Sequence, residues 1–124
     1  MRIRTLVPLM LLASASFAFA EPPIKTVKTE KGDVIAGEKG MTLYTFKNDK
    51  KGVSNCYEGC AKAWPPFIAE AGAKGDEDYS LVKRKDGTMQ WAKYGMPLYY
   101  WMKDQKEGDV KGDGFKGVWD AARP

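Results

Sequence analysis

The chain contains no histidine, and beyond residue 20 its only serines are Ser54 and Ser80. A Ser-His-Asp triad and the histidine-based zinc sites of hydrolases are therefore excluded. The sequence also lacks a glycine-rich phosphate loop between a strand and a helix. A catalytic metal would need carboxylates, thioethers or the two thiols as ligands, and the two cysteines do not have a recognised zinc spacing. We therefore expect a protein that is not an enzyme and that holds no cofactor or metal.

The sequence has no apolar run as long as the roughly 20 residues that a membrane-spanning helix needs. The N-terminus instead reads two arginines, an apolar run over residues 6–12 and small residues ending at Ala20. This order is typical of a cleavable signal peptide. We expect residues 1–20 to be removed after Ala20, leaving residues 21–124 as a single soluble domain in the periplasm or outside the cell. No cysteine precedes Cys56, so the sequence predicts no lipid attachment and no stable membrane anchor.

The excess of positive charge is small once the leader is set aside. The whole chain has 20 Lys and Arg against 16 Asp and Glu. Without Arg2 and Arg4 the balance is 18 − 16 = +2. The remaining lysines alternate with acidic residues and do not form a basic run, so we expect no nucleic-acid partner.

The most informative feature is an internal repeat. At an offset of 55, residues 24–69 align with residues 79–124 without a gap, and 11 of the 46 positions are identical. The identical positions include two separate glycines, a Met-x-Leu-Tyr sequence, an aspartate and a tryptophan in each copy. A duplication of this kind predicts two copies of one structural unit.

Each copy has the pattern of three β-strands separated by turns. Asp86-Gly87, between two such strands, is a strong hairpin signal. Both third strands carry apolar residues on both faces, which favours a central or sandwiched position. We expect a mostly β domain of two tandem three-stranded meanders about a pseudo-two-fold axis, with a short helical turn in residues 56–63. The predicted strands are 24–29, 34–36 and 41–46 in the first copy and 79–84, 88–92 and 96–101 in the second.

Both third strands lead into the same pattern of a tyrosine, an aromatic residue and an aspartate. Tyr44, Phe46 and Asp49 form the first motif, and their equivalents in the second copy are Tyr99, Trp101 and Asp104. Over nearly the whole chain beyond the leader, the sequence resembles the secreted repeat family of bacterial lipoproteins that carry a Tyr-x-(Phe/Trp/Tyr)-x-x-Asp motif. The resemblance implies a family of unknown function. Unlike many lipoprotein members, this chain lacks the cysteine that would carry the lipid.

The two cysteines are expected to form a disulfide, Cys56 to Cys60, because export delivers them to an oxidising compartment. They and the following Trp64-Pro65-Pro66 also resemble the family's pattern. A soft-metal site or a thiol-exchange site is the alternative. The second copy has Lys111 and Phe115 in place of the cysteines, so the repeat can form without the bridge.

Two further groups of side chains have a structural and a functional interpretation. The Tyr and Asp of each motif can satisfy each other inside the loop, which we favour, or present a polar patch to a ligand. Asp104, Asp109 and Asp113 can form a solvated acidic loop, which we favour, or ligate calcium, although their spacing does not match a calcium-binding loop.

The sequence predicts a small soluble periplasmic binding or accessory protein without catalytic activity. Its partner would be a small apolar or aromatic ligand or a periplasmic protein, contacting aromatic residues near the motif loops. The alternatives are an interaction module, such as an inhibitor of a cell-wall enzyme, and a thiol or copper handler. The residues expected to form the binding surface are the motif residues Tyr44, Phe46, Asp49, Tyr99, Trp101 and Asp104 with Trp64 and Trp119.

Overall fold

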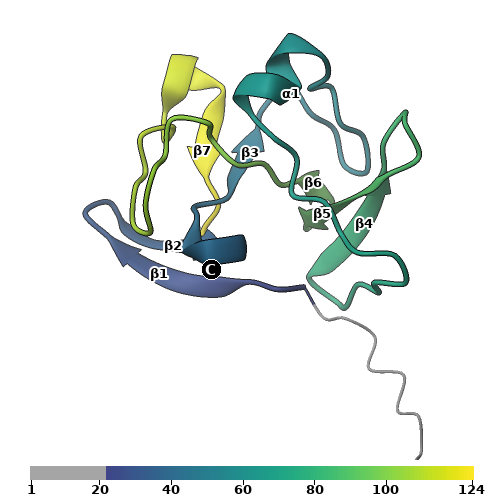
Figure 1. The fold of residues 1–124 in the computed structure, drawn as a ribbon, viewed down its shortest axis with the longest axis horizontal. Coiled ribbons are helices and arrows are strands. Elements are labelled where there is room, and N and C mark those ends of the chain that lie inside the picture. The colour runs from purple at the N-terminus through teal and green to yellow at the C-terminus, as the bar shows by residue number, and fades with distance from the viewer. Residues whose placement is uncertain (1–21) are drawn as a thin grey trace, which may run out of the picture.

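The structure is a computed structural model and describes residues 22–124 (Figure 1). The expected leader and its cleavage after Ala20 lie outside the described residues. No helix in the described part of the chain is long and apolar enough to cross a membrane. The elements follow in the order β1 (Lys25–Thr29), β2 (Gly32–Ala36), the 3-10 helix η1 (Glu38–Gly40), β3 (Tyr44–Phe46), α1 (Gly59–Ala63), β4 (Tyr79–Lys83), β5 (Met89–Lys93), β6 (Met96–Pro97), the 3-10 helix η2 (Phe115–Gly117) and β7 (Trp119–Ala121).

The fold is mostly β, as predicted, and its helices are short turns. β1 pairs with β2, and β4, β5 and β6 form a three-stranded sheet. The expected meander is therefore complete only in the second repeat, because the third strand of the first repeat contributes a single bridge between Ala36 and Thr42. The helix α1 lies inside the predicted helical turn and ends at Ala63, before Trp64, where the following proline disfavours helical geometry.

The ungapped alignment of the two repeats is wrong by one residue in the second strand of each hairpin. Val27 lies opposite Val34, whereas the equivalent Val82 lies opposite Gln90. The second hairpin thus has one more residue in its turn. The next turn of that repeat is one residue shorter, which restores the common register in the third strand.

The last segment of each repeat leaves its own hairpin and pairs with the hairpin of the other repeat. We call each hairpin, together with the segment that it receives, a lobe. In the second lobe, Trp91 N–H donates to Phe67 O over 2.9 Å, and Phe67 N–H donates to Leu98 O over 2.9 Å. Phe67 belongs to the first repeat, whereas Trp91 and Leu98 belong to the second. This lobe is continuous in sequence, because residues 70–78 lead directly from Phe67 and its neighbours into β4.

The first lobe has the same bonds but is assembled from both ends of the described chain. Ile35 N–H donates to Ala122 O over 2.9 Å, and Ala122 N–H donates to Leu43 O over 2.8 Å. Beside it, β3 pairs with β7, with Phe46 opposite Trp119, and the two strands lie next to each other in Figure 1. The C-terminal segment therefore closes the lobe that β1 and β2 begin.

Two hydrophobic clusters hold the lobes together. The third predicted strand of each repeat contributes side chains to both clusters. Leu43 and Leu98 lie in one cluster, whereas Tyr44 and Tyr99 lie in the other. This is the two-faced burial that the sequence predicts for the third strands. The first cluster is aromatic and consists of Tyr44, Phe46, Trp64, Tyr99, Trp101 and Trp119 with Val34, Cys56, Val110 and Ala121.

The closing role of the C-terminal segment predicts the effect of truncation. Removing residues 119–124 deletes the buried Trp119 and all of β7, and the loss of a buried tryptophan alone costs about 3–5 kcal/mol. This is comparable with the total stability of a small domain, about 5–15 kcal/mol. We expect the truncated protein to lose cooperative thermal unfolding measured by circular dichroism. Deletion of the exposed Pro124 alone is the control, and a cooperative transition in the longer truncation would contradict the prediction.

Candidate functional site

The tyrosine and aspartate of the motif are hydrogen-bonded across the repeats, not within them. Tyr44 OH donates to Asp104 Oδ2 over 2.5 Å, and Tyr99 OH donates to Asp49 Oδ2 over 2.6 Å. The expectation that each tyrosine serves the aspartate of its own motif is therefore wrong. The cause is the central pairing of Tyr44 with Tyr99, which exchange both backbone N–H···O bonds, so each side chain extends into the other repeat.

The second oxygen of each carboxylate holds the loop that follows its own motif. Asp49 Oδ1 accepts the N–H of Asn55 over 2.7 Å, and Asp104 Oδ1 accepts the N–H of Lys111 over 3.0 Å. Each aspartate thus links the tyrosine of one repeat to the loop of the other. Asp49 and Asp104 are both buried, and such groups need hydrogen-bond partners.

Phe46 and Trp101 of the two motifs form a four-membered stack with Trp64 and Trp119, and this stack also crosses between the repeats. Trp64 and Trp119 lie face to face with ring centroids 3.8 Å apart. Phe46 stacks on the outer face of Trp119 at 4.2 Å, and Trp101 stacks on Trp64 at 3.9 Å. Tyr44 packs edge-on against Trp64, as Tyr99 does against Trp119. Aromatic pairs of this kind contribute about 0.5–1.5 kcal/mol each beyond their buried area.

All eight residues expected to form a binding surface are thus brought together, but in the interior. Their exposed fractions lie between 0% for Tyr44 and Tyr99 and 8% for Phe46. The aromatic groove expected beside the motif loops is therefore not formed by these side chains.

A buried arginine that the sequence does not single out completes one side of this core. Arg84 donates to Ser54 Oγ over 3.1 Å, to Gln90 Oε1 over 2.7 Å and to Cys56 O over 2.9 Å. Ser54 also bonds Tyr99 OH over 2.6 Å. Tyr99 gives its only proton to Asp49, so Ser54 must be the donor to Tyr99.

The resulting chain of hydrogen bonds runs in one direction, from the Arg84 guanidinium to the Asp49 carboxylate. Nothing in the sequence indicates its burial, because an arginine at the end of a predicted strand is ordinarily exposed.

Burial sets the protonation behaviour of the motif residues. It raises the pKa of Asp49, against the lowering effect of the hydrogen bonds from Tyr99 and Asn55 and of the Arg84 charge. Burial likewise raises the pKa of Asp104, against the hydrogen bonds from Tyr44 and Lys111. The pKa values of Tyr44 and Tyr99 are raised by burial and by their bonds to these carboxylates. Both tyrosines therefore stay protonated as donors.

The predicted disulfide is present between Cys56 and Cys60, with Cα atoms 5.2 Å apart. Cys56 is fully buried against the aromatic cluster, and its carbonyl oxygen is held by Arg84. The bridge connects this anchored point to α1, which leads into Trp64. A ring this short stabilises the fold by about 2 kcal/mol in loop-entropy terms.

The three aspartates considered as calcium ligands have separate roles. Asp104 faces the core, Asp109 accepts the N–H groups of Gln105 and Lys106, and Asp113 accepts the N–H of Ala121. Within residues 22–124 no group of three His, Cys, Asp or Glu side chains is placed to hold a metal ion. The alternative of a calcium loop is therefore not supported by the arrangement.

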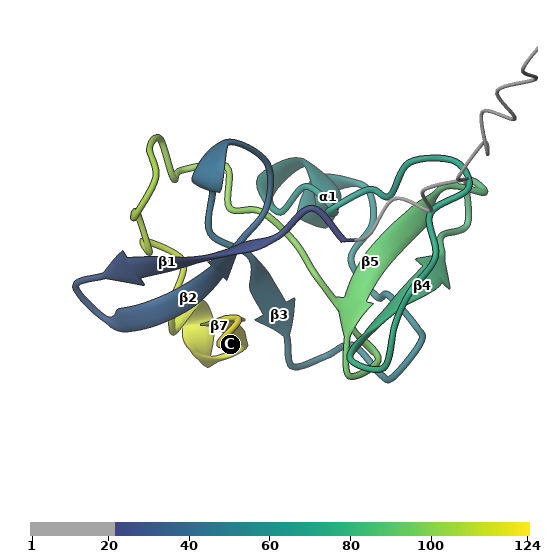
Figure 2. The same cartoon turned by 90° about the horizontal axis from the view of Figure 1, so that it is seen from below.

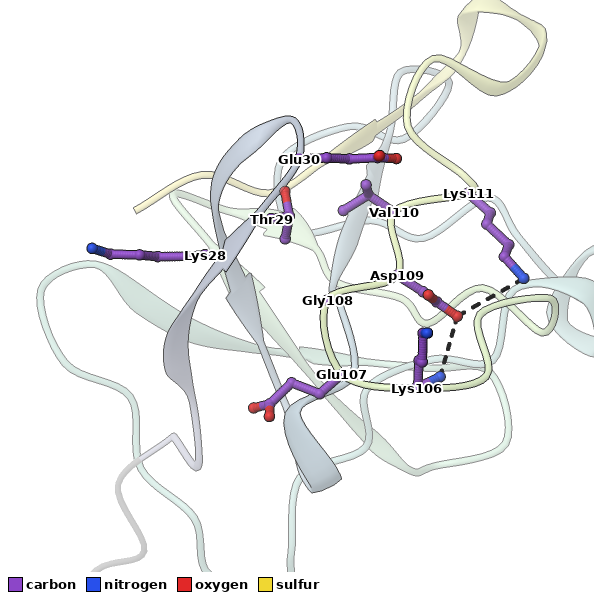
Figure 3. Close-up of a pocket in the computed structure, with 9 residues that line it drawn as sticks. All are labelled: Lys28, Thr29, Glu30, Lys106, Glu107, Gly108, Asp109, Val110 and Lys111. Carbon is purple, nitrogen blue, oxygen red and sulfur yellow. Dashed lines mark hydrogen bonds and ion pairs between the residues drawn. The ribbon is translucent and has the colours of Figure 1, made fainter.

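A surface hollow lies between the tip of the β1–β2 hairpin and the second motif loop. It has a volume of about 480 Å³, and we call it the hairpin groove. Figure 3 shows Thr29 and Glu30 on the hairpin side, with Asp109 and the two lysines that flank it on the loop side. The lining residues are Lys28, Thr29, Glu30, Lys106, Glu107, Gly108, Asp109, Val110 and Lys111.

The charges of the hairpin groove are only partly neutralised within the protein. Glu107 pairs with Lys25 outside the groove, and Asp109 lies 3.9 Å from Lys111 Nζ. Backbone hydrogen bonds, that of Gln105 above all, lower the pKa of Asp109, so its carboxylate stays ionised. The remaining side chains present charges of both signs to solvent.

Comparison with known protein families finds the same family in both repeats. The model of a family described as a secreted repeat of unknown function matches residues 25–68 and again residues 80–123. The chain belongs to this family of secreted repeats. No curated protein and no solved structure matches the chain. The two matched segments agree with the duplication found in the sequence, and the family is one whose proteins are secreted.

The crossed pairing can be tested with double-mutant cycles. Tyr44→Phe leaves an oxygen of Asp104 and the N–H of Gly112 without the hydroxyl they bond, at a cost of about 1–3 kcal/mol. Because Tyr44 and Asp104 are in contact, Tyr44→Phe and Asp104→Asn should couple by about 0.5–3 kcal/mol in urea unfolding. Tyr44→Phe and Asp49→Asn should be additive. Coupling within one motif and additivity across the repeats would disprove the crossed pairs.

The raised aspartate pKa values predict a pH dependence of stability. The folded state holds these protons more tightly than the unfolded chain, so the contribution is fully present below the ordinary value of 3.8. It is lost as pH rises through the folded pKa values. Relative to Asp49→Asn/Asp104→Asn, the parent should therefore lose unfolding free energy as pH rises from about 4 to 7. Urea titrations at each pH measure the unfolding free energy of both proteins. A value for the parent that rises with pH relative to the variant would contradict the prediction.

Proposed function

We propose that this secreted protein is a non-catalytic accessory protein of the periplasm that binds a charged segment of a partner protein in the hairpin groove. The observation that carries the proposal is the internal location of the motif. Tyr44, Asp49, Tyr99 and Asp104 bond one another and backbone N–H groups, so they act as a scaffold. Recognition then falls to the surface loops that this scaffold positions.

The composition of the hairpin groove favours a polypeptide segment over a small apolar ligand. Small-molecule pockets are lined mainly by apolar and aromatic side chains, whereas Val110 is the one large apolar residue among those lining this groove. Side chains of both charge signs, such as Lys28, Lys106 and Glu30, suit a partner of complementary pattern. The groove also joins the two repeats, since its walls come from the first hairpin and the second motif loop.

Charge reversal in the hairpin groove tests this function. Lys28→Glu/Lys106→Glu should abolish partner cross-linking to the exported protein in the periplasm, because complementary charges become repulsive. Thermal unfolding should change little, since both side chains are exposed. Lys62→Glu/Lys83→Glu changes the net charge equally at exposed positions outside the groove and is the matched control. Equal cross-linking of the parent, the groove variant and the control would reject the proposal.

A further inference from the structure

A second surface carries exposed apolar side chains, and it lies apart from the hairpin groove. The turn of residues 50–53 follows the first motif, and the turn of residues 93–96 joins β5 to β6. Gly52 N–H donates to Gly95 O over 2.8 Å, and a side-chain carbon placed on Gly95 would lie 3.1 Å from Lys51 Cβ. The two turns therefore pack side by side. Figure 2 shows the chain after β3 running to the end of β5, and we call these turns the two-turn ridge.

The ridge exposes two large apolar side chains at neighbouring tips. Tyr94 is 63% exposed and Val53 is 48% exposed. Both project from tight turns that are fixed by backbone bonds, since Lys50 and Val53 exchange N–H···O bonds and Lys93 lies opposite Met96. Tyr94 also borders a hollow of about 240 Å³. Protruding apolar tips can enter the boundary between lipid headgroups and acyl chains.

The backbone conformation of Tyr94 indicates that a tyrosine does not stabilise the fold at this position. Its φ is 48°, in the left-handed region, and the following Gly95 has a φ of 82°. A two-residue turn with two positive φ values strongly prefers Asn-Gly, and a bulky residue is unusual there. The equivalent position of the first repeat is Lys39. An exposed aromatic ring at a position where a small polar residue is more stable is typical of a contact surface.

Positive charge lies beside these tips, and the acidic run of residues 76–78 adjoins Tyr94, whose N–H donates to Asp78 O over 2.8 Å. Within residues 22–124, neither Lys50 nor Lys51 forms an ion pair, whereas the neighbouring Lys47 is 3.7 Å from Asp120. Lys93 Nζ donates to Arg123 O and lies 5.4 Å from the centre of the Tyr94 ring. Three cationic side chains thus flank one tyrosine and one valine.

We propose that the two-turn ridge docks the protein on an anionic lipid surface. Tyr94 and Val53 would enter the headgroup region, where the amphipathic tyrosine ring is favoured, and Lys50, Lys51 and Lys93 would face lipid phosphates. The charge complementarity selects anionic over zwitterionic lipid. This peripheral contact is independent of the hairpin groove, whose lining residues it does not use.

Flotation with lipid vesicles tests the docking. The exported protein should bind vesicles of phosphatidylglycerol and phosphatidylcholine in equal parts, should bind phosphatidylcholine vesicles far less, and should be released by high salt. Lys50→Gln/Lys51→Gln should weaken partitioning about five-fold per lysine, roughly 25-fold for the pair. The matched control is Lys62→Gln/Lys83→Gln, with the same change of charge and less than a two-fold effect.

Tyr94→Asn separates binding from folding. It creates the preferred Asn-Gly turn, so the thermal midpoint should stay equal or rise while partitioning falls. No binding of the parent to the anionic vesicles, or equal binding by the parent and Tyr94→Asn, would overturn the proposal. So would equal losses in the two lysine pairs, or tighter binding to polygalacturonate than to vesicles, which would assign the ridge to acidic glycans.

Discussion

The reciprocal bond between the tyrosine of one repeat and the aspartate of the other is the constraint on which the fold depends. Tyr44 reaches Asp104 and Tyr99 reaches Asp49, and the second oxygen of each carboxylate fixes a loop. Within its own repeat, each buried aspartate has a hydrogen-bond donor for only one of its two carboxylate oxygens. Since an unpaired buried polar group costs about 1–3 kcal/mol, correct packing of one repeat requires the other, and the duplication is a folding requirement.

The sequence predicts much of this architecture because duplication and alternation are local signals. The hairpins, the helical turn, the disulfide and the burial of both faces around Leu43 and Leu98 are all found where the residues indicate. The exchange of partners could not be predicted, because Tyr44 with Asp49 and Tyr44 with Asp104 are equivalent in a symmetric sequence. The burial of Arg84 also has no local signal, since it depends on Ser54 and Cys56, which lie 30 and 28 residues away in the sequence.

The exchange also explains why the motif includes a second aromatic residue. Phe46 and Trp101 each stack on the tryptophan of the opposite repeat, so the tyrosine, the aromatic residue and the aspartate of one motif all contact the other copy. A substitution at any of the three therefore weakens the contact between the lobes. The spacing of the motif is set by this interface, and no separate ligand is needed to account for it.

Because the core is nearly symmetric, the differences between the repeats lie mainly at its edge and on its surface. The turn that holds Lys39 and Gly40 in the first repeat holds Tyr94 and Gly95 in the second, with the same left-handed geometry. The two turns differ in length by one residue but share these positive φ values, and they carry different side chains. The hairpin groove lies at the other motif loop, so the proposed lipid contact and the proposed protein contact do not share residues.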